Sequence, residues 1–210
     1  MMKVASVNAG PAVTVDIGGE PVPTAIFKYP VSGRIAVRGV NLAGDDQADR
    51  ENHGGPDRSL YAYASEDIAW WGQTLARSDI TAGSFGENLT TLGLDVNAAL
   101  IGERWRIGTA LFEVSQPRIP CFKLAMRLNE PKIVRLFAKS LRTGTYLRII
   151  EEGAVAAGDA IEIEFRPGHE VSIRDFAEIY FSKREDAGRL LEASALSEDW
   201  RSWAMQQNEP

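Results

Sequence analysis

The stretch GTYLRIIEEGAVAAGDAIEIEF, residues 144–165, predicts two β-strands joined across glycine-containing turns. Its strand segments mix β-branched and aromatic residues, which suit a pleated, half-buried surface. Many short strands with few helices predict a mainly β (α+β) fold, a curled, barrel-like β domain with helical insertions. The earlier segments with the same pattern are VTVDIGG (13–19), TAIFKY (24–29), GRIAVRGV (33–40) and ALFEVSQ (110–116).

Two segments inside this β-rich region have the periodicity of helices. SEDIAWWGQTLAR (65–77) predicts a helix with Ser65 as its N-cap and acidic residues in the first turn. PKIVRLFAKSLR (131–142) has apolar residues at helical spacing, and we expect Pro131 at the helix start. Both are interpreted as insertions between strands.

The pattern changes after Pro167, so we predict a β domain over 1–166 and a helical module over 167–210. Residues 172–207 have helical periodicity, a Ser172/Asp175 capping pair, and breaks near Ser182 and Ser194. The module holds five basic and nine acidic residues, a net charge of −4. This acidity argues against DNA binding and favours an interaction or dimerisation module, including a homodimer.

Composition predicts a globular cytoplasmic protein. The chain has 210 residues, of which 44% are hydrophobic and 25% charged. A single cysteine fits a reducing compartment, and no apolar run approaches the roughly 20 residues that span a bilayer. A net charge of −6 argues against nucleic acid as a partner. Two histidines and one cysteine exclude a zinc site built from several such ligands.

Two glycine-containing loops are candidate binding loops. In ENHGGPDRSLYAY (51–63), the N–H groups of Gly54 and Gly55 can converge on an anion, and His53 and Arg58 add side-chain donors. A tight turn with a capping histidine explains the same pattern. In GSFGENLTTLG (83–93), glycines flank a Phe and lead to Asn88; taken alone, this pattern is a loop that enters a strand.

The third candidate loop, QPRIPCFKL (116–124), contains the chain's single cysteine, Cys121. Pro117 and Pro120 stiffen the backbone, which lowers the entropy lost on binding. The guanidinium of Arg118 should lower the pKa of the thiol and favour the thiolate, the form that binds metals. A lone cysteine is more often a small buried hydrophobe, and the loop context is what favours a functional thiol here.

In series, these loops resemble the MOSC domain, the module named after the C-terminal part of molybdenum cofactor sulfurases. The resemblance covers most of residues 25–166 and rests on the HGG, FGENL and QPR-x-PC motifs in this order. The tail after residue 166 resembles the three-helix module of bacterial stand-alone members. The family's cysteine, which binds molybdenum cofactor or carries sulfur, falls on Cys121. His53, Gly54 and Gly55 fall on the HGG loop, Asn88 on FGEN and Arg118 on QPR.

The resemblance implies two alternative functions. The first is a molybdenum-cofactor (molybdopterin) oxidoreductase that reduces N-hydroxylated bases or related small N–OH compounds. Cys121 would ligate molybdenum, His53 would take part in catalysis, and an external electron donor would be required. The second is a carrier that delivers the cofactor or sulfur from Cys121 to another molybdoenzyme. Pyridoxal phosphate is not expected, because 210 residues leave no room for the sulfurase domain that binds it.

Overall fold

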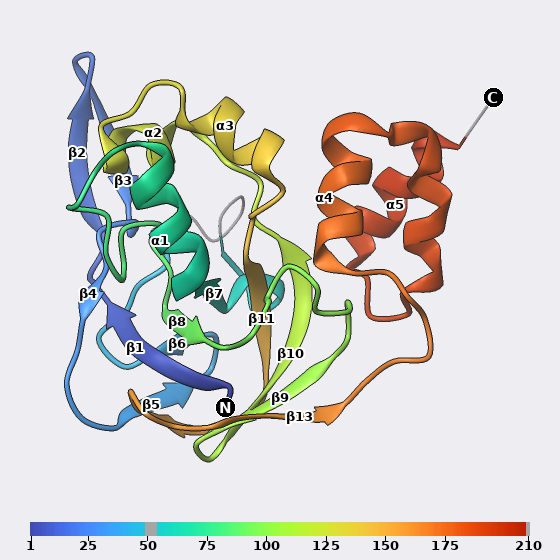
Figure 1. The fold of residues 1–210 in the computed structure, drawn as a ribbon, viewed down its shortest axis with the longest axis horizontal. Helices are drawn as coiled ribbons and strands as arrows, with labels where there is room; N and C mark the ends of the chain where they lie inside the picture. The colour runs from blue at the N-terminus through green and yellow to red at the C-terminus, as the bar shows by residue number, and fades with distance from the viewer. Residues whose placement is uncertain (49–53, 209–210) are drawn as a thin grey trace.

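The computed structural model describes residues 1–48 and 54–208, and within them a single large sheet organises the fold (Figure 1). The strands of this sheet follow the order β13-β9-β10-β11-β7-β8-β1-β4. Neighbouring strands are antiparallel except for β7 and β8. Their bounds are β1 Lys3–Ala9, β4 Tyr29–Pro30, β7 Leu60–Ala64, β8 Leu89–Leu92, β9 Arg104–Ile107, β10 Ala110–Pro117, β11 Thr145–Glu151 and β13 Ile161–Phe165.

The sheet curls until its two sides meet beside the N-terminus. A bridge joins Lys3 to Ala160, and the backbone N–H of Val4 donates to the Asp159 carbonyl at 2.9 Å. The contact is local, so the sheet is curled without closing into a barrel. The mainly β, curled α+β fold expected from the sequence is confirmed.

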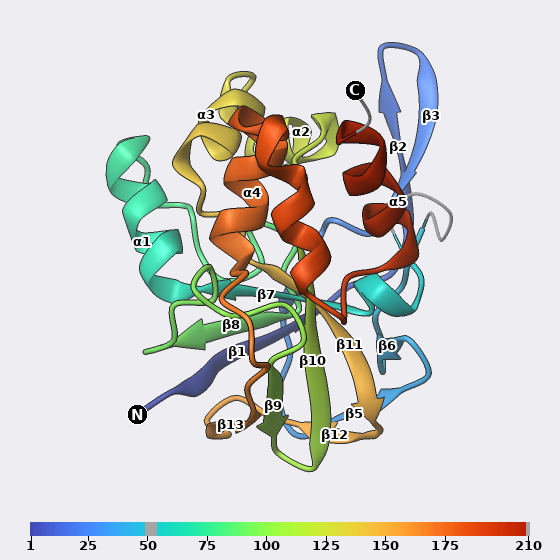
Figure 2. The ribbon, with the colours of Figure 1, turned by 90° about the vertical axis from the view of Figure 1, so that its right-hand side faces the viewer.

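Two smaller sheets complete the strand pairing of the described residues. One contains β12 (Gly153–Val155), β5 (Ile35–Arg38) and β6 (Asn41–Leu42) in this order. The other is a hairpin of β2 (Val13–Ile17) and β3 (Glu20–Thr24), which projects from the body in Figures 1 and 2. The first of these sheets packs against the curled end of the large sheet (Figure 2).

Helices cover the end of the molecule that lies away from the β12-β5-β6 sheet, and they form two groups (Figure 1). The helices α1 (Ser65–Thr74), α2 (Phe122–Leu128) and α3 (Ile133–Ser140) surround an aromatic cluster that includes Trp71, Phe85 and Phe137. No helix of the described residues has the length and apolarity needed to cross a membrane.

The second group is the helical tail: α4 (Ile173–Ser182), the 3-10 segment η2 (Arg184–Glu192) and α5 (Glu198–Gln207). The expected capping box is present, because the Ser172 hydroxyl accepts from the Asp175 N–H at 3.1 Å while the Asp175 carboxylate accepts from the Ser172 N–H at 3.0 Å. Phe176 and Leu190 are fully buried in the same apolar cluster as Trp105 of the sheet. The tail therefore completes the sheet's core.

Several element boundaries differ from the sequence prediction. Ser65 is the first residue of α1 and Ala64 is its N-cap, and α3 begins at Ile133, two residues after Pro131. Residues 144–165 contain three strands, because Gly153–Val155 leaves the main sheet to pair with β5.

The segment 24–29 does not form one strand: Thr24 ends β3, Tyr29 begins β4, and residues 25–28 between them make local hydrogen bonds. The Ile26 N–H donates to the Thr24 hydroxyl at 3.2 Å, and the Lys28 N–H donates to the Ile26 carbonyl at 3.0 Å. These local bonds replace the ladder that a strand would need. The helix Phe122–Leu128, directly after Cys121, was not predicted.

Because the tail shares its core with the sheet, we predict that Phe176→Ala destabilises the whole protein by about 3–5 kcal/mol. Urea unfolding followed by tryptophan fluorescence and by circular dichroism should give one coincident transition. Phe165→Ala is the control, because this ring is 51% exposed and its loss should cost far less. Separate transitions for tail and sheet in Phe176→Ala would contradict the shared core.

Candidate functional site

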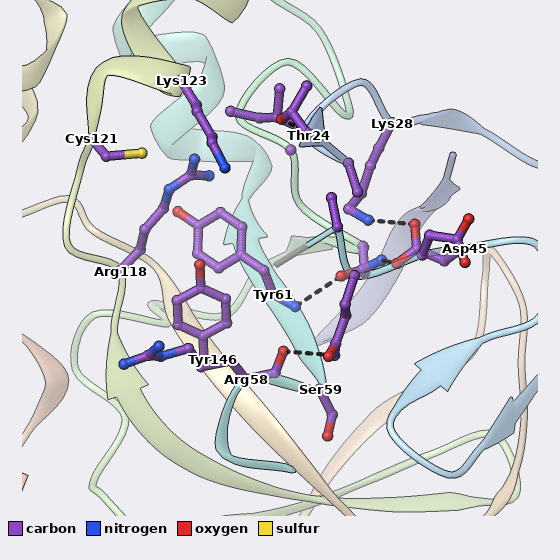
Figure 3. Close-up of a pocket in the computed structure, with 17 residues that line it drawn as sticks. Thr24, Lys28, Asp45, Arg58, Ser59, Tyr61, Arg118, Cys121, Lys123 and Tyr146 are labelled. Atoms are coloured by element: carbon purple, nitrogen blue, oxygen red, sulfur yellow. Dashed lines mark hydrogen bonds and ion pairs between the residues drawn. The ribbon is translucent and has the colours of Figure 1, made fainter. Parts of the chain in front are cut away.

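A pocket of about 100 Å³ lies where the loop after β10 faces the segment after β3 (Figure 3). It brings together four of the residues singled out in the sequence, Arg58, Asn88, Arg118 and Cys121. His53 lies outside the described residues. The pocket is lined by Thr24, Ala25, Ile26, Lys28, Asp45, Asp46, Gln47, Ala48, Arg58, Ser59, Tyr61, Gly86, Asn88, Arg118, Cys121, Lys123 and Tyr146.

Cys121 lies at the edge of this pocket, half-buried, in extended backbone directly before α2. The strand β10 ends at Pro117, and the following loop carries the thiol across to the start of the helix. Figure 3 shows its sulfur pointing toward the guanidinium of Arg118. The cysteine is therefore a pocket residue and not a filler of the sealed core.

Arg118 is a buried cation, only 7% exposed. Its guanidinium donates to the Phe85 carbonyl and lies over the Tyr61 ring at 5.1 Å from the centroid. Burial alone would lower the pKa of Arg118. The Tyr146 and Tyr61 hydroxyls and the Cys121 thiol outweigh this effect, and the pKa lies above the ordinary value for arginine. A permanent positive charge therefore faces the thiol.

Asn88 is buried directly before β8, and its side-chain amide makes three hydrogen bonds within the protein. Its oxygen accepts from the Tyr61 N–H at 3.0 Å. Its nitrogen donates to the Asn8 carbonyl at 3.3 Å and to the Asp45 carboxylate at 2.9 Å. Asn88 lines the pocket, but these bonds make it a residue that holds the wall in place.

The backbone conformation of the Gly83–Glu87 turn explains why both of its glycines are needed. Gly83 and Gly86 have φ of 82° and 71°, a region that disfavours other residues. A Cβ on Gly83 would lie 2.5 Å from the Lys28 carbonyl oxygen. The buried Glu87 carboxylate accepts from the Gly83 N–H at 2.6 Å and the Phe85 N–H at 3.1 Å. The motif thus packs one pocket wall against the Lys28 segment.

Of the HGG loop, the structure describes Gly54 and Gly55. Gly54 and Gly55 are not among the described lining residues of the pocket. The Gly55 N–H donates to the Gln47 side chain at 2.9 Å, so it is already used within the protein. The loop continues into a 3-10 turn, Pro56–Arg58, from which Arg58 reaches the pocket lining.

Lys28 and Asp45 form a buried ion pair that sequence analysis missed. Their side chains are 8% and 2% exposed. Burial lowers the pKa of Lys28, and the attraction of Asp45 opposes that effect. Neither residue belongs to a recognisable motif; the available signal was a lysine inside the apolar run TAIFKY.

Comparison with models of protein families shows which family this chain belongs to. The model of the MOSC domain matches residues 49–162, more than half of the chain. The chain belongs to the MOSC domain family. Uncharacterized protein YflK of Bacillus subtilis (strain 168) is 34% identical over 209 residues, 98% of this chain and 94% of that protein.

Other MOSC-family relatives share the sequence and the fold. Protein YiiM of Escherichia coli (strain K12) is 35% identical over 186 residues, 86% of this chain and 83% of that protein. The crystal structure of YiiM from Geobacillus stearothermophilus has a TM-score of 0.82 at 31% identity and covers both chains fully. A "Reductase" of Gibberella moniliformis (strain M3125 / FGSC 7600) is 28% identical over 193 residues, which are 90% of this chain and 34% of that protein.

For the glycine turn, we predict that Gly83→Ala destabilises the protein by at least about 1 kcal/mol more than Gly33→Ala. Both glycines have φ near 83°, so both variants carry the left-handed strain of about 1–2 kcal/mol. A Cβ at Gly33 would meet no atom within 4 Å, whereas at Gly83 it would clash with backbone. Urea denaturation of both variants measures the difference, and equal losses would refute the close approach.

Proposed function

We propose that this protein is a molybdenum-cofactor-dependent reductase of N-hydroxylated bases or related N–OH compounds. The observation that carries the proposal is a half-buried thiol facing a buried arginine inside a pocket. The fixed positive charge favours the thiolate of Cys121, a soft ligand that suits molybdenum. Membership of the MOSC family and the fungal relative's name, "Reductase", support an oxidoreductase.

The donor set fits a metal that arrives within an organic cofactor. Among the described residues, no group of three or more His, Cys, Asp or Glu side chains could hold a metal ion. Cys121 would then supply a single protein ligand, and the cofactor would bring the others. When bound, the cofactor would supply the two-electron chemistry for converting an N–OH group and two protons into N–H and water.

The other pocket residues have supporting roles in this proposal. Arg118 and Arg58 would bind the anionic parts of the cofactor, because guanidinium groups form strong charge-assisted hydrogen bonds. Asn88 would hold the wall rather than contact the cofactor, since its amide is engaged with Tyr61 and Asp45. His53 stays a proposed catalytic residue, and Gly54 and Gly55 stay proposed cofactor contacts, although the Gly55 N–H would have to exchange its bond to Gln47 for one to the cofactor.

The electrons would come from a separate redox protein. The described residues contain a single cysteine, which excludes an iron–sulfur cluster held by several cysteines. The fungal relative supports a donor outside this domain, because its match to this chain leaves about two thirds of its own length for other parts.

A carrier of cofactor or sulfur is the second candidate function. The position of Cys121 at the pocket edge favours it, since the next residue, Phe122, is 53% exposed. A thiol so placed could pass its cargo to a docked molybdoenzyme. The pocket beside the thiol favours the reductase, because a carrier has no need to enclose a substrate.

We predict that Cys121→Ser keeps the fold but loses bound molybdenum. Serine has nearly the same size, yet its hydroxyl is a harder and far less acidic ligand than the thiol. Elemental analysis of protein from a host that makes the cofactor measures the metal. Cells that depend on the variant should also lose protection against an N-hydroxylated base analogue. Phe122→Ala, which retains the thiol, is the control and should keep its molybdenum.

The outcomes separate the candidates. Full molybdenum content and full protection in Cys121→Ser would refute a role for the thiol. If purified wild-type protein holds molybdenum but, with an artificial electron donor, never reduces an N-hydroxylated base, the carrier replaces the reductase. Circular dichroism of each variant must first match the wild type.

A further inference from the structure

The segment that contains α2 and α3 carries the opposite charge from the rest of the chain. Residues 122–142 contain six basic side chains and one acidic one, a net charge of +5. Because the whole chain has a net charge of −6, the remaining residues carry −11. The positive charge is therefore concentrated on the two helices that directly follow Cys121, where it attracts an acidic partner.

Three of these basic side chains form a stripe on α3. Lys132, Arg135 and Lys139 are exposed and are spaced by three and four residues, which places them on one face of the helix. Ile133 and Phe137, on the other face, are buried in the aromatic cluster beneath the helix. The packing of the buried face thus leaves this basic stripe, Lys132, Arg135 and Lys139, in solvent.

The basic stripe is neither paired nor favourable for the helix. No carboxylate of the described residues pairs with it, whereas the nearby Arg142 pairs with Asp67. Like charges three or four residues apart destabilise a helix. Lys132, at the N-cap, also adds a positive charge at the positive end of the helix dipole. The stability of α3 therefore does not explain the stripe.

Exposed aromatic rings lie on the same side of the fold as the two helices, which pack against each other. Phe122 is 53% exposed at the first position of α2, directly after Cys121. Tyr29 is 57% exposed, and the Arg127 guanidinium of α2 lies over its ring, 5.5 Å from the centroid. Protein interfaces combine apolar contacts with a polar rim, and those of electron-transfer complexes are small. The α2–α3 face has this composition.

The acidic tail limits what the basic stripe can bind. Figure 1 shows α3 between α2 and the tail helix α4, and α3 contacts α4. The tail has a net charge of −4. An extended polyanion or an anionic membrane would meet this negative surface together with the positive one. A protein with a compact acidic patch meets the stripe alone, and repulsion from the tail orients it.

We propose that the α2–α3 face, with the basic stripe, is the docking surface for an acidic electron-donor protein that carries a flavin or an iron–sulfur group. This inference rests on the proposed function, because the described residues contain a single cysteine and a reductase then needs an external donor. Each turnover oxidises the donor by two electrons and, with two protons, converts one N–OH group into N–H and water. The charges speed the encounter, and the exposed rings supply contact area.

The test compares two charge-reversed variants of the cofactor-loaded protein. Arg135→Glu/Lys139→Glu, the stripe variant, reverses two charges of the basic stripe. Lys3→Glu/Arg38→Glu is the matched control, because it reverses two exposed charges on β1 and β5, away from α3 (Figure 1). Reduced flavodoxin and reduced ferredoxin, both acidic proteins, are the donor probes. At low ionic strength the stripe variant should raise the KM for the donor at least about tenfold, and the control less than about twofold.

Two internal measurements accompany this comparison. Reduced methyl viologen, a small dye that needs no docking surface, should give the same kcat in the wild type and both variants. In the wild type, kcat/KM for the donor protein should fall as salt is raised, and this dependence should weaken in the stripe variant. Equal losses in both variants, a salt-independent wild type, or failure of both donor proteins while the dye drives turnover would overturn the docking surface.

Arg135→Gln/Lys139→Gln covers the chance that two glutamates unfold α3. This variant removes both charges without adding opposite ones, and its circular dichroism should match that of the wild type. Its KM for the donor should rise in the same direction as in the stripe variant, but by less. An unchanged KM in this folded variant would count against the proposal.

Binding measured without turnover separates this proposal from the proposed function. Calorimetric titration of flavodoxin into cofactor-free protein at low ionic strength should show binding that the stripe variant loses and the control keeps. If this pattern holds but the dye drives no reduction, the reductase fails and the docking surface stands. If the dye drives reduction and the three proteins bind flavodoxin equally, the docking surface alone fails. Binding to phosphatidylglycerol vesicles in place of the donor, lost in the stripe variant, would also overturn the proposal.

Discussion

The geometry of the pocket depends on the hydrogen bonds of the Asn88 side-chain amide. The parallel pair β7 and β8 begins here, and the Asn88 amide bonds to the Tyr61 backbone of one strand and the Asn8 backbone of β1. Its remaining N–H fixes the Asp45 carboxylate, which in turn holds Lys28. One buried amide thus joins the sheet to the ion pair of Lys28 and Asp45 in the pocket wall. Because the amide is buried, loss of any of its hydrogen bonds would leave a polar group without a partner, which is costly.

The sequence predicted the fold class and several of the strands, among them β2, β5, β10, β11 and β13, because these depend on local patterns. It also predicted that separated loops hold Arg58, Asn88, Arg118 and Cys121, which the fold brings to one pocket. It did not predict that Asn88 faces protein partners, because hydrogen-bond partners 80 residues away leave no local pattern.

Other features escaped prediction because their causes are not local. The ion pair of Lys28 and Asp45 joins two segments that carry no motif. Its importance comes from its burial, which depends on the tertiary fold and is not visible in the local sequence. Residues 25–28 include strand-forming types, yet the Thr24 hydroxyl accepts from the Ile26 N–H, which a continuous strand would have used. The short helix after Cys121 lacks an N-capping side chain, so its start carries no sequence signal.

The single cysteine at the pocket edge also has a practical consequence. Because Cys121 is the chain's one thiol and is half-buried beside Arg118, a thiol-reactive dye would label this protein at a single position. The rate of that labelling depends on access through the pocket and on the thiolate fraction. It would therefore report pocket occupancy in the native, unmutated protein, and would rank ligands by the protection that each provides.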